Sequence, residues 1–172
     1  MIWELSHRAS DLSRELADRH YNRQKPGATG FVPPGRCLVL RAETATGKAF
    51  WVTSWPFAEY TKHEWAGAWI CSAFRNEGAG TASDLIRDAV AATKTFFGNP
   101  PPLGMVTFVD RAKVKPTRVR GKDVWGWTYL QAGFRECGET KVNKLLALQL
   151  LPQDMPDAES WAGMQSTLDL SL

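Results

Sequence analysis

Residues 64–98, EWAGAWICSAFRNEGAGTASDLIRDAVAATKTFFG, decide the fold class of this chain. The apolar run 64–74 predicts a strand, because it combines aromatic and small apolar residues and ends just before a charged residue. Residues 81–98 predict a helix, since apolar side chains recur there at 3.6-residue spacing. A glycine-rich segment, 75–80, joins the predicted strand to the predicted helix.

This joining segment, Arg75-Asn76-Glu77-Gly78-Ala79-Gly80, has the pattern R-x-x-G-x-G. Two glycines let a ligand approach the backbone, and the free amides and positive dipole end of the following helix favour a pyrophosphate. A P-loop would need a lysine after the last glycine, and a dinucleotide-binding motif would need an earlier glycine, so neither fits. A coenzyme A pyrophosphate loop is the interpretation that remains. A glycine-rich connector without a ligand is the alternative.

Outside this stretch, the hydrophobic pattern predicts further elements in a mixed order. Helices are expected over 9–20 and 124–132, and strands over 37–44, 49–55, 103–110, 134–140 and 144–151. Residues 22–36 are rich in Gly and Pro, which predicts a loop. This order predicts an α/β fold in which helices flank a mixed central sheet.

Composition limits the class of protein further. A length of 172 residues suits one domain, and 44% hydrophobic with 23% charged residues is typical of a soluble globular chain. No apolar run is long enough to span a membrane, the first residues lack a secretory signal, and three separated cysteines suit a reducing cytoplasm. Secreted, membrane-spanning and zinc-ribbon proteins are therefore not expected. We expect one domain over 1–151 and an acidic tail over 152–172.

A basic run follows the strand predicted over 103–110. Six cations occur in it without an acid: Arg111, Lys113, Lys115, Arg118, Arg120 and Lys122. Flexible Lys and Arg side chains are typical of binding to a phosphate backbone, which predicts a DNA-binding segment. A solvated loop is the alternative. Trp125 and Trp127 adjoin the run, and stacking on an extruded base or packing in the core are the two uses expected for them.

Residues 129–134, YLQAGF, supply a second motif, Y-x-x-x-G-F. In their order and spacing, the two motifs resemble the GNAT acetyltransferase superfamily over about residues 64–151. The resemblance implies a GNAT-like fold in which acetyl-CoA lies between two splayed parallel strands, here 67–74 and 103–109. It also implies that Tyr129 protonates the leaving thiolate. The coenzyme-binding residues that it implies are Phe74, Arg75, Asn76, Glu77, Gly78, Ala79, Gly80 and Thr81.

Three further features carry a closer resemblance. His20-Tyr21 precedes the Gly/Pro-rich loop, Arg75 opens the glycine motif, and Asp110 closes the strand TFVD. In these features the chain resembles the Mom family of phage DNA-modification enzymes. These enzymes convert adenine in double-stranded DNA to its N6-carbamoylmethyl (methylcarbamoyl) form and so protect phage DNA from host restriction. The resemblance implies acetyl-CoA and iron as cofactors, the host cytoplasm as location, and His20, Tyr21 and Asp110 as the catalytic and metal-binding cluster.

Alternatives to these functions and sites stay open. Imidazole, phenolate and carboxylate form a donor set that suits iron. Equally, His20 could cap the end of the first helix, Tyr21 could pack on it, and Asp110 could cap the next turn. The rival functions are an ordinary GNAT enzyme that acetylates a protein or small-molecule amine, and a non-catalytic DNA-binding protein on a GNAT scaffold. The target DNA sequence and the formation of a homodimer are not determined by the sequence.

Overall fold

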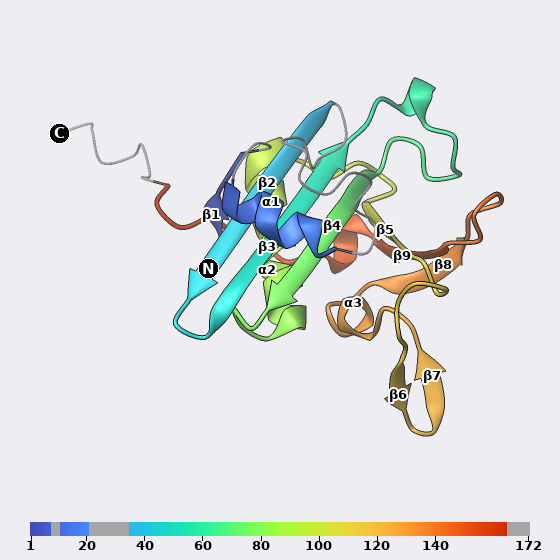
Figure 1. Cartoon of the computed structure of the whole chain (residues 1–172). Coiled ribbons are helices and arrows are strands. Elements are labelled where there is room, and N and C mark those ends of the chain that lie inside the picture. The colour runs from blue at the N-terminus through green and yellow to red at the C-terminus, as the bar shows by residue number, and fades with distance from the viewer. Residues whose placement is uncertain (8–10, 21–34, 165–172) are drawn as a thin grey trace.

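The computed structural model describes residues 1–7, 11–20 and 35–164, which contain a seven-stranded mixed sheet (Figure 1). The strands lie in the order β1 (Glu4–Leu5), β2 (Arg36–Thr44), β3 (Gly47–Trp55), β4 (Trp69–Glu77), β5 (Met105–Val109), β9 (Leu146–Leu150) and β8 (Arg135–Glu139). β4 and β5 run parallel, and the other neighbouring pairs run antiparallel. The predicted α/β class with a mixed central sheet is therefore confirmed.

Helices pack on both faces of this sheet. The described helices are α1 (Asp11–Asp18), α2 (Ala82–Phe97) and α3 (Trp127–Gln131), with short 3-10 turns at Ala58–Tyr60 and Pro152–Asp154. α1 lies across one face, where Leu16 and Ala17 pack against Phe50. α2 lies on the other face, and its apolar stripe joins a larger core that contains the fully buried Trp51 and Trp69. The helix predicted over 81–98 is confirmed as α2.

β4 and β5 pair along only a short stretch before they separate. The paired positions are Trp69 with Met105, Ile70 with Val106 and Cys71 with Thr107. Beyond them, β4 continues along β3 as far as Asn76, while β5 continues along β9. A register shift between Val52 and Thr53 of β3 lies opposite this point, and such bulges increase local twist. The two parallel strands therefore diverge toward their carboxyl ends.

Strand β4 differs from the prediction at both ends. Residues 64–68 form turns, and the Ala68 N–H donates to the Trp65 carbonyl at 3.2 Å. At the other end, Arg75 pairs with Phe50 of β3, and the strand extends to Glu77. The predicted boundary before Arg75 is wrong, because pairing with β3 continues the strand and the local sequence does not show that pairing.

The basic run 111–122, expected to be a loop, contributes to a separate β-hairpin. Its strands β6 (Thr117–Val119) and β7 (Lys122–Val124) pair antiparallel, and the hairpin extends away from the seven-stranded sheet (Figure 1). Arg120 and Gly121 join the strands with φ values of 49° and 77°. A two-residue type I′ turn requires positive φ at both positions. At the base of the hairpin, the Trp125 indole N–H donates to the Val114 carbonyl at 3.2 Å.

The acidic segment after β9 packs on the domain as far as residue 164. The Ala162 N–H donates to the Trp3 carbonyl at 2.7 Å, and the Trp161 ring lies 6.1 Å from the Phe96 ring. Residues 152–164 therefore add to the packing around Trp3, and 165–172 lie outside the described residues. Of the helices in the described ranges, none has the length and apolar character needed to cross a membrane.

Candidate functional site

A cavity of about 250 Å³, called the cleft below, lies where β4 and β5 separate. β4 and β5 contribute Cys71, Phe74 and Thr107 to its walls, and Lys115, Trp127 and Tyr129 come from the base of the hairpin and from α3. His20 reaches the cleft from the end of α1. The cleft therefore opens at the position where the GNAT resemblance implies a coenzyme between two parallel strands.

Tyr129, the predicted proton donor, lies in the wall of this cleft. Its hydroxyl oxygen lies 3.6 Å from the Cys71 sulfur. Its ring packs edge-on against Phe74 and Phe134, with centroid distances of 6.3 and 5.4 Å. Burial raises the pKa of the Cys71 thiol to about 12, so this thiol stays protonated at neutral pH. The Cys71 side chain therefore contacts the Tyr129 hydroxyl as a neutral thiol, and it does not act as a thiolate nucleophile.

Polar residues of the strands add cleft contacts that the sequence reasoning missed. Ser72 and Thr107 line the cleft from β4 and β5, and Thr128 lines it from α3. The Thr107 hydroxyl donates to the Cys71 carbonyl at 3.2 Å, which links the two strands at their last paired position. The only sequence signal for these residues is a hydroxyl near the end of an apolar strand, and that signal does not show which strands are neighbours.

The glycine loop that follows β4 is folded by the Asn76 side chain. The Asn76 amide nitrogen donates to the Gly80 carbonyl at 2.8 Å, and its oxygen accepts the Ala79 N–H at 3.0 Å. The intrahelical bonds of α2 begin with the Leu85 N–H, which donates to the Thr81 carbonyl at 3.0 Å. The backbone N–H groups of the first turn precede that bond and have no intrahelical acceptor. The loop and this first turn are therefore placed to bind an anion.

The two glycines of the loop serve different purposes. Gly78 has a φ of +89°, and a Cβ built there would lie 2.9 Å from the Thr46 carbonyl oxygen. Gly78 is therefore required by the approach of the β2–β3 turn, whether or not a ligand binds. A Cβ at Gly80 would meet only Leu85 side-chain atoms, the nearest at 3.8 Å, which is ordinary contact. Gly80 has no such internal requirement, which leaves ligand approach as its expected role.

Arg75, predicted to bind the coenzyme, joins a charged network with Arg19 of the α1 end. Its Nε donates to a Glu77 carboxylate oxygen at 2.7 Å, and its Nη1 donates to the Arg19 carbonyl at 2.8 Å. Arg19 binds the same carboxylate through two nitrogens, at 2.7 and 2.8 Å. These bonds, first from Arg19 and then from Arg75, lower the pKa of Glu77 to about 2. The network ties the end of α1, and with it His20, to β4.

The structure describes two members of the predicted metal cluster. His20 lines the cleft, and its ring lies edge-on to Phe50 at 6.4 Å. Asp110 follows β5 and caps the next turn, where one carboxylate oxygen accepts the Ala112 N–H at 3.0 Å. Its other oxygen lies 3.9 Å from the Lys113 ammonium. Tyr21 lies outside the described residues, so the convergence of the three stays a prediction.

No group of three or more His, Cys, Asp and Glu side chains that could hold a metal occurs among the residues that the structure describes. A carboxylate has about four lone-pair directions, so the two partners of Asp110 leave it capacity for a further ligand. His20 supplies an imidazole at the cleft. Of the iron donor set that the Mom resemblance implies, the described residues place His20 at the cleft, whereas Asp110 is not among the residues that line it.

The six cations of the basic run divide into two groups. Arg111, Lys113 and Arg118 form ion pairs with Glu139, Asp110 and Asp123 respectively. The remaining cations, Lys115, Arg120 and Lys122, are exposed and make no ion pair with an acidic residue of the described ranges. Lys115 lies at the cleft, whereas Arg120 and Lys122 lie at the far end of the hairpin. The unpaired positive charge is thus concentrated at the cleft and at the hairpin tip.

A second cavity of about 630 Å³ adjoins the cleft. Phe108 of β5 lines both cavities. The second cavity also has His63 and Trp65 in its wall, and the His63 ring lies 5.0 Å from the Phe108 ring. Trp65 itself is buried. The two cavities therefore share Phe108 as a lining residue.

Comparison of the chain with protein-family models, with curated proteins and with solved structures finds no match.

Proposed function

We propose that this chain is a GNAT-like transferase that uses acetyl-CoA to modify adenine in double-stranded DNA in the cytoplasm. The product we propose is the N6-carbamoylmethyl base that the Mom resemblance implies. Acetyl-CoA supplies its two carbons, and the reaction also requires an amine-level nitrogen donor for the amide and a two-electron oxidant for the bond between N6 and the former methyl carbon. The observation that carries the proposal is the cleft between the diverging parallel strands β4 and β5, with Tyr129 in its wall. The anion-binding loop at the start of α2 supports it, because coenzyme A carries a pyrophosphate.

In this proposal the glycine loop and the cleft have separate roles. The backbone from Gly78 to Thr81 and the first turn of α2 bind the pyrophosphate, and the thioester reaches between β4 and β5. When the nitrogen donor attacks the thioester carbonyl, its C–N bond forms as the C–S bond breaks, and the coenzyme leaves as a thiolate. The Tyr129 O–H then donates its proton to the sulfur, a transfer between groups of similar basicity. The adjoining cavity beyond Phe108 holds the acceptor base.

The DNA acceptor is supported by the unpaired cations Lys115, Arg120 and Lys122. The N6 amine of adenine is a weak nucleophile, because its lone pair is delocalised into the ring. An iron ion would supply Lewis-acid activation, with His20, Tyr21 and Asp110 as its proposed ligands. An ordinary GNAT acetyltransferase would need neither this ion nor the hairpin.

Mass spectrometry of nucleosides tests the proposal. DNA from cells that express the chain should contain a modified adenosine, and DNA from cells that express Tyr129→Phe should contain much less. Purified Tyr129→Phe should still bind acetyl-CoA in calorimetry, because only the hydroxyl is removed. Unmodified DNA, together with acetylation of a protein or small amine, would leave the ordinary GNAT acetyltransferase as the function.

The proposed iron site has a separate test. Metal analysis of the purified chain should find about one iron per chain, and Asp110→Asn should lower that content while acetyl-CoA binding stays unchanged. A wild-type chain that modifies adenine after complete removal of iron would contradict the metal assignment. It would leave the coenzyme cleft unaffected.

A further inference from the structure

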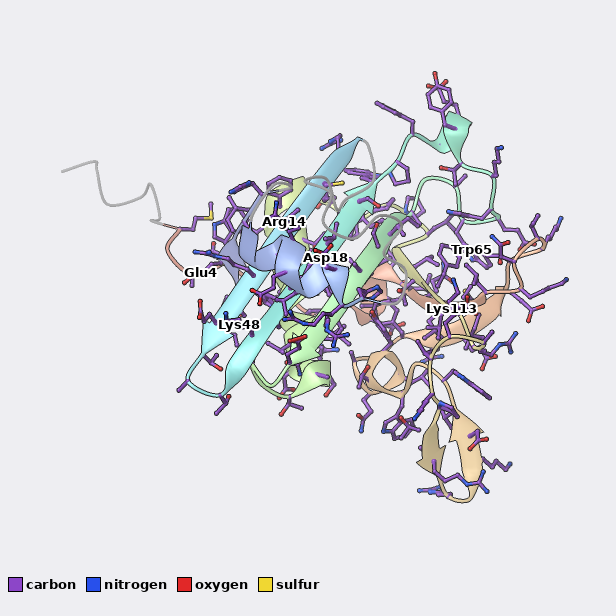
Figure 2. All side chains as sticks on the ribbon, viewed as in Figure 1. Glu4, Arg14, Asp18, Lys48, Trp65 and Lys113 are labelled. Carbon is purple, nitrogen blue, oxygen red and sulfur yellow. The ribbon has the colours of Figure 1, made fainter. Side chains whose placement is uncertain are left out.

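The hairpin β6–β7 carries its unpaired charge at one end. Arg118 and Asp123 lie opposite each other in the register and form an ion pair at 2.9 Å, so the middle of the hairpin is neutral. Arg120 and Lys122 lie at the tip and have no such partner among the described acidic residues. Figure 2 shows the hairpin side chains projecting outward from the narrow ribbon, away from the sheet.

The hairpin is held in a defined orientation even though it has only two strands. An isolated two-stranded hairpin is marginally stable in water. Here the type I′ turn matches the twist of the strands, and the hydrogen bond from Trp125 to the Val114 carbonyl attaches the base to the domain. Val114 and Trp125 also pack against the main core. The tip is therefore presented at a constant position relative to the cleft.

The size and charge of this ribbon fit one groove of duplex DNA. The three residue steps from Thr117 to Arg120 span roughly 10 Å at about 3.3 Å per residue. The major groove of B-DNA is about 8.5 Å deep and about 12 Å wide, and it admits a two-stranded ribbon. Lys115 lines the cleft and lies two residues before β6 begins. A duplex that follows these cations passes from the hairpin tip to the cleft.

We infer that the β6–β7 hairpin enters the major groove of double-stranded DNA and that Arg120 and Lys122 bind phosphates at its rims. The hairpin then sets the position of the duplex, and the second cavity beside the cleft receives the base. This inference rests on the proposed DNA substrate and deepens it, because it names the element that binds the duplex and the two side chains that carry the contact.

Fluorescence anisotropy with a labelled 30-base-pair duplex, measured on the full chain between 50 and 200 mM NaCl, tests this inference. The variant is Arg120→Asn with Lys122→Gln, because asparagine tolerates the positive φ of the turn. Each lost phosphate contact lowers the slope of log K against log salt by about 0.9. The double variant should therefore lower the slope by about 1.8, which corresponds to binding weakened about 200-fold at 50 mM and about 20-fold at 200 mM.

A matched control removes the same charge elsewhere. Arg41→Gln with Lys48→Gln removes two cations of β2 and β3 that line neither cavity, and it should leave the slope unchanged. Equal slopes for the tip variant and the wild type would overturn the inference, as would equal losses for the tip variant and the control. A tip variant that loses binding to phosphatidylserine vesicles and keeps its DNA slope would overturn it in favour of a membrane surface.

The outcome is separable from that of the proposed function. A wild-type chain that modifies adenine, together with a tip variant of unchanged slope, would refute the role of the hairpin and leave the transferase standing. If the tip variant shows the predicted slope change and the wild-type chain modifies no adenine, the hairpin assignment would stand without the transferase.

Discussion

Replacing Gly78 and Gly80 separately with alanine distinguishes backbone strain from ligand contact in the glycine loop. Gly78→Ala places a side chain at a φ of +89° and 2.9 Å from the Thr46 carbonyl oxygen. The left-handed backbone costs about 1–2 kcal/mol and the close contact about 1–3 kcal/mol. At about 2–4 °C per kcal/mol for a chain of this size, the melting temperature should fall by roughly 5–15 °C.

Gly80→Ala should behave differently, because its Cβ would meet only Leu85 atoms at 3.8 Å. A substitution without strain or a clash changes the unfolding free energy by about 0.5 kcal/mol or less, so the melting temperature should stay within about 2 °C of the wild type. If the loop binds the coenzyme pyrophosphate, the added methyl group keeps the phosphate from the backbone. The affinity for acetyl-CoA should then fall at least about tenfold, or about 1.4 kcal/mol.

Thermal melting by circular dichroism and calorimetry with acetyl-CoA measure the two effects independently. A Gly80→Ala variant that binds acetyl-CoA as tightly as the wild type would remove the loop from the coenzyme site. A Gly78→Ala variant with a wild-type melting temperature would show that the contact with Thr46 does not constrain the loop. Since Gly78 is needed by the fold, a loss of binding in Gly78→Ala alone would not identify a ligand site.

Three further predictions follow from the contacts of single side chains. Because Arg19 and Arg75 hold the pKa of Glu77 at about 2, below its ordinary 4.5, the stabilisation from this carboxylate is complete above pH 4.5 and is lost as the pH falls toward 2. Urea denaturation should find Glu77→Gln less stable than the wild type at pH 7, with a smaller difference at pH 3. Burial raises the pKa of the Cys71 thiol to about 12, so iodoacetamide at pH 8 should modify the exposed Cys137 well before Cys71. Peptide mass spectrometry measures the two rates, and equal rates in the folded chain would contradict the burial of Cys71. Trp125→Phe should remove the hydrogen bond at the base of the hairpin, worth about 1 kcal/mol, and speed hydrogen exchange in β6 and β7 with little change in α2.

Local sequence patterns predicted those elements whose stability depends on their own residues. Strands over 37–44 and 49–55 were predicted from two β-rich runs, and the structure confirms them as the antiparallel pair β2 and β3. The helix α2 was predicted because its apolar side chains recur on one face, and that face is buried. In α2 the 3.6-residue periodicity of the apolar side chains matches the face that packs on the core, whereas β3 is buried on both faces and was predicted from its β-forming residues.

Elements that depend on a distant partner were predicted less well. β4 extends past Arg75 because β3 pairs with it there, and nothing within the segment shows that pairing. The β6–β7 hairpin was missed because its turn is Arg120-Gly121 rather than an asparagine-glycine pair, and because six cations obscure the short alternation of Thr117 and Val119. Hairpin formation there also depends on the Trp125 anchor, which is a tertiary contact.

In the candidate site, a single sequence motif likewise combines a local pattern with contacts to distant partners. The pattern R-x-x-G-x-G suggested one ligand-binding unit, but successive residues of a strand point to opposite faces of the sheet. Arg75 and Glu77 contact the end of α1, while Asn76 folds the glycine loop before α2. The motif therefore serves two places in the fold, since Arg75 and Glu77 tie the end of α1, next to His20 of the cleft, to β4, and Asn76 folds the backbone before α2. Glu77→Gln should consequently disturb the α1 side of the cleft, and acetyl-CoA affinity should be unchanged if the loop alone binds the pyrophosphate.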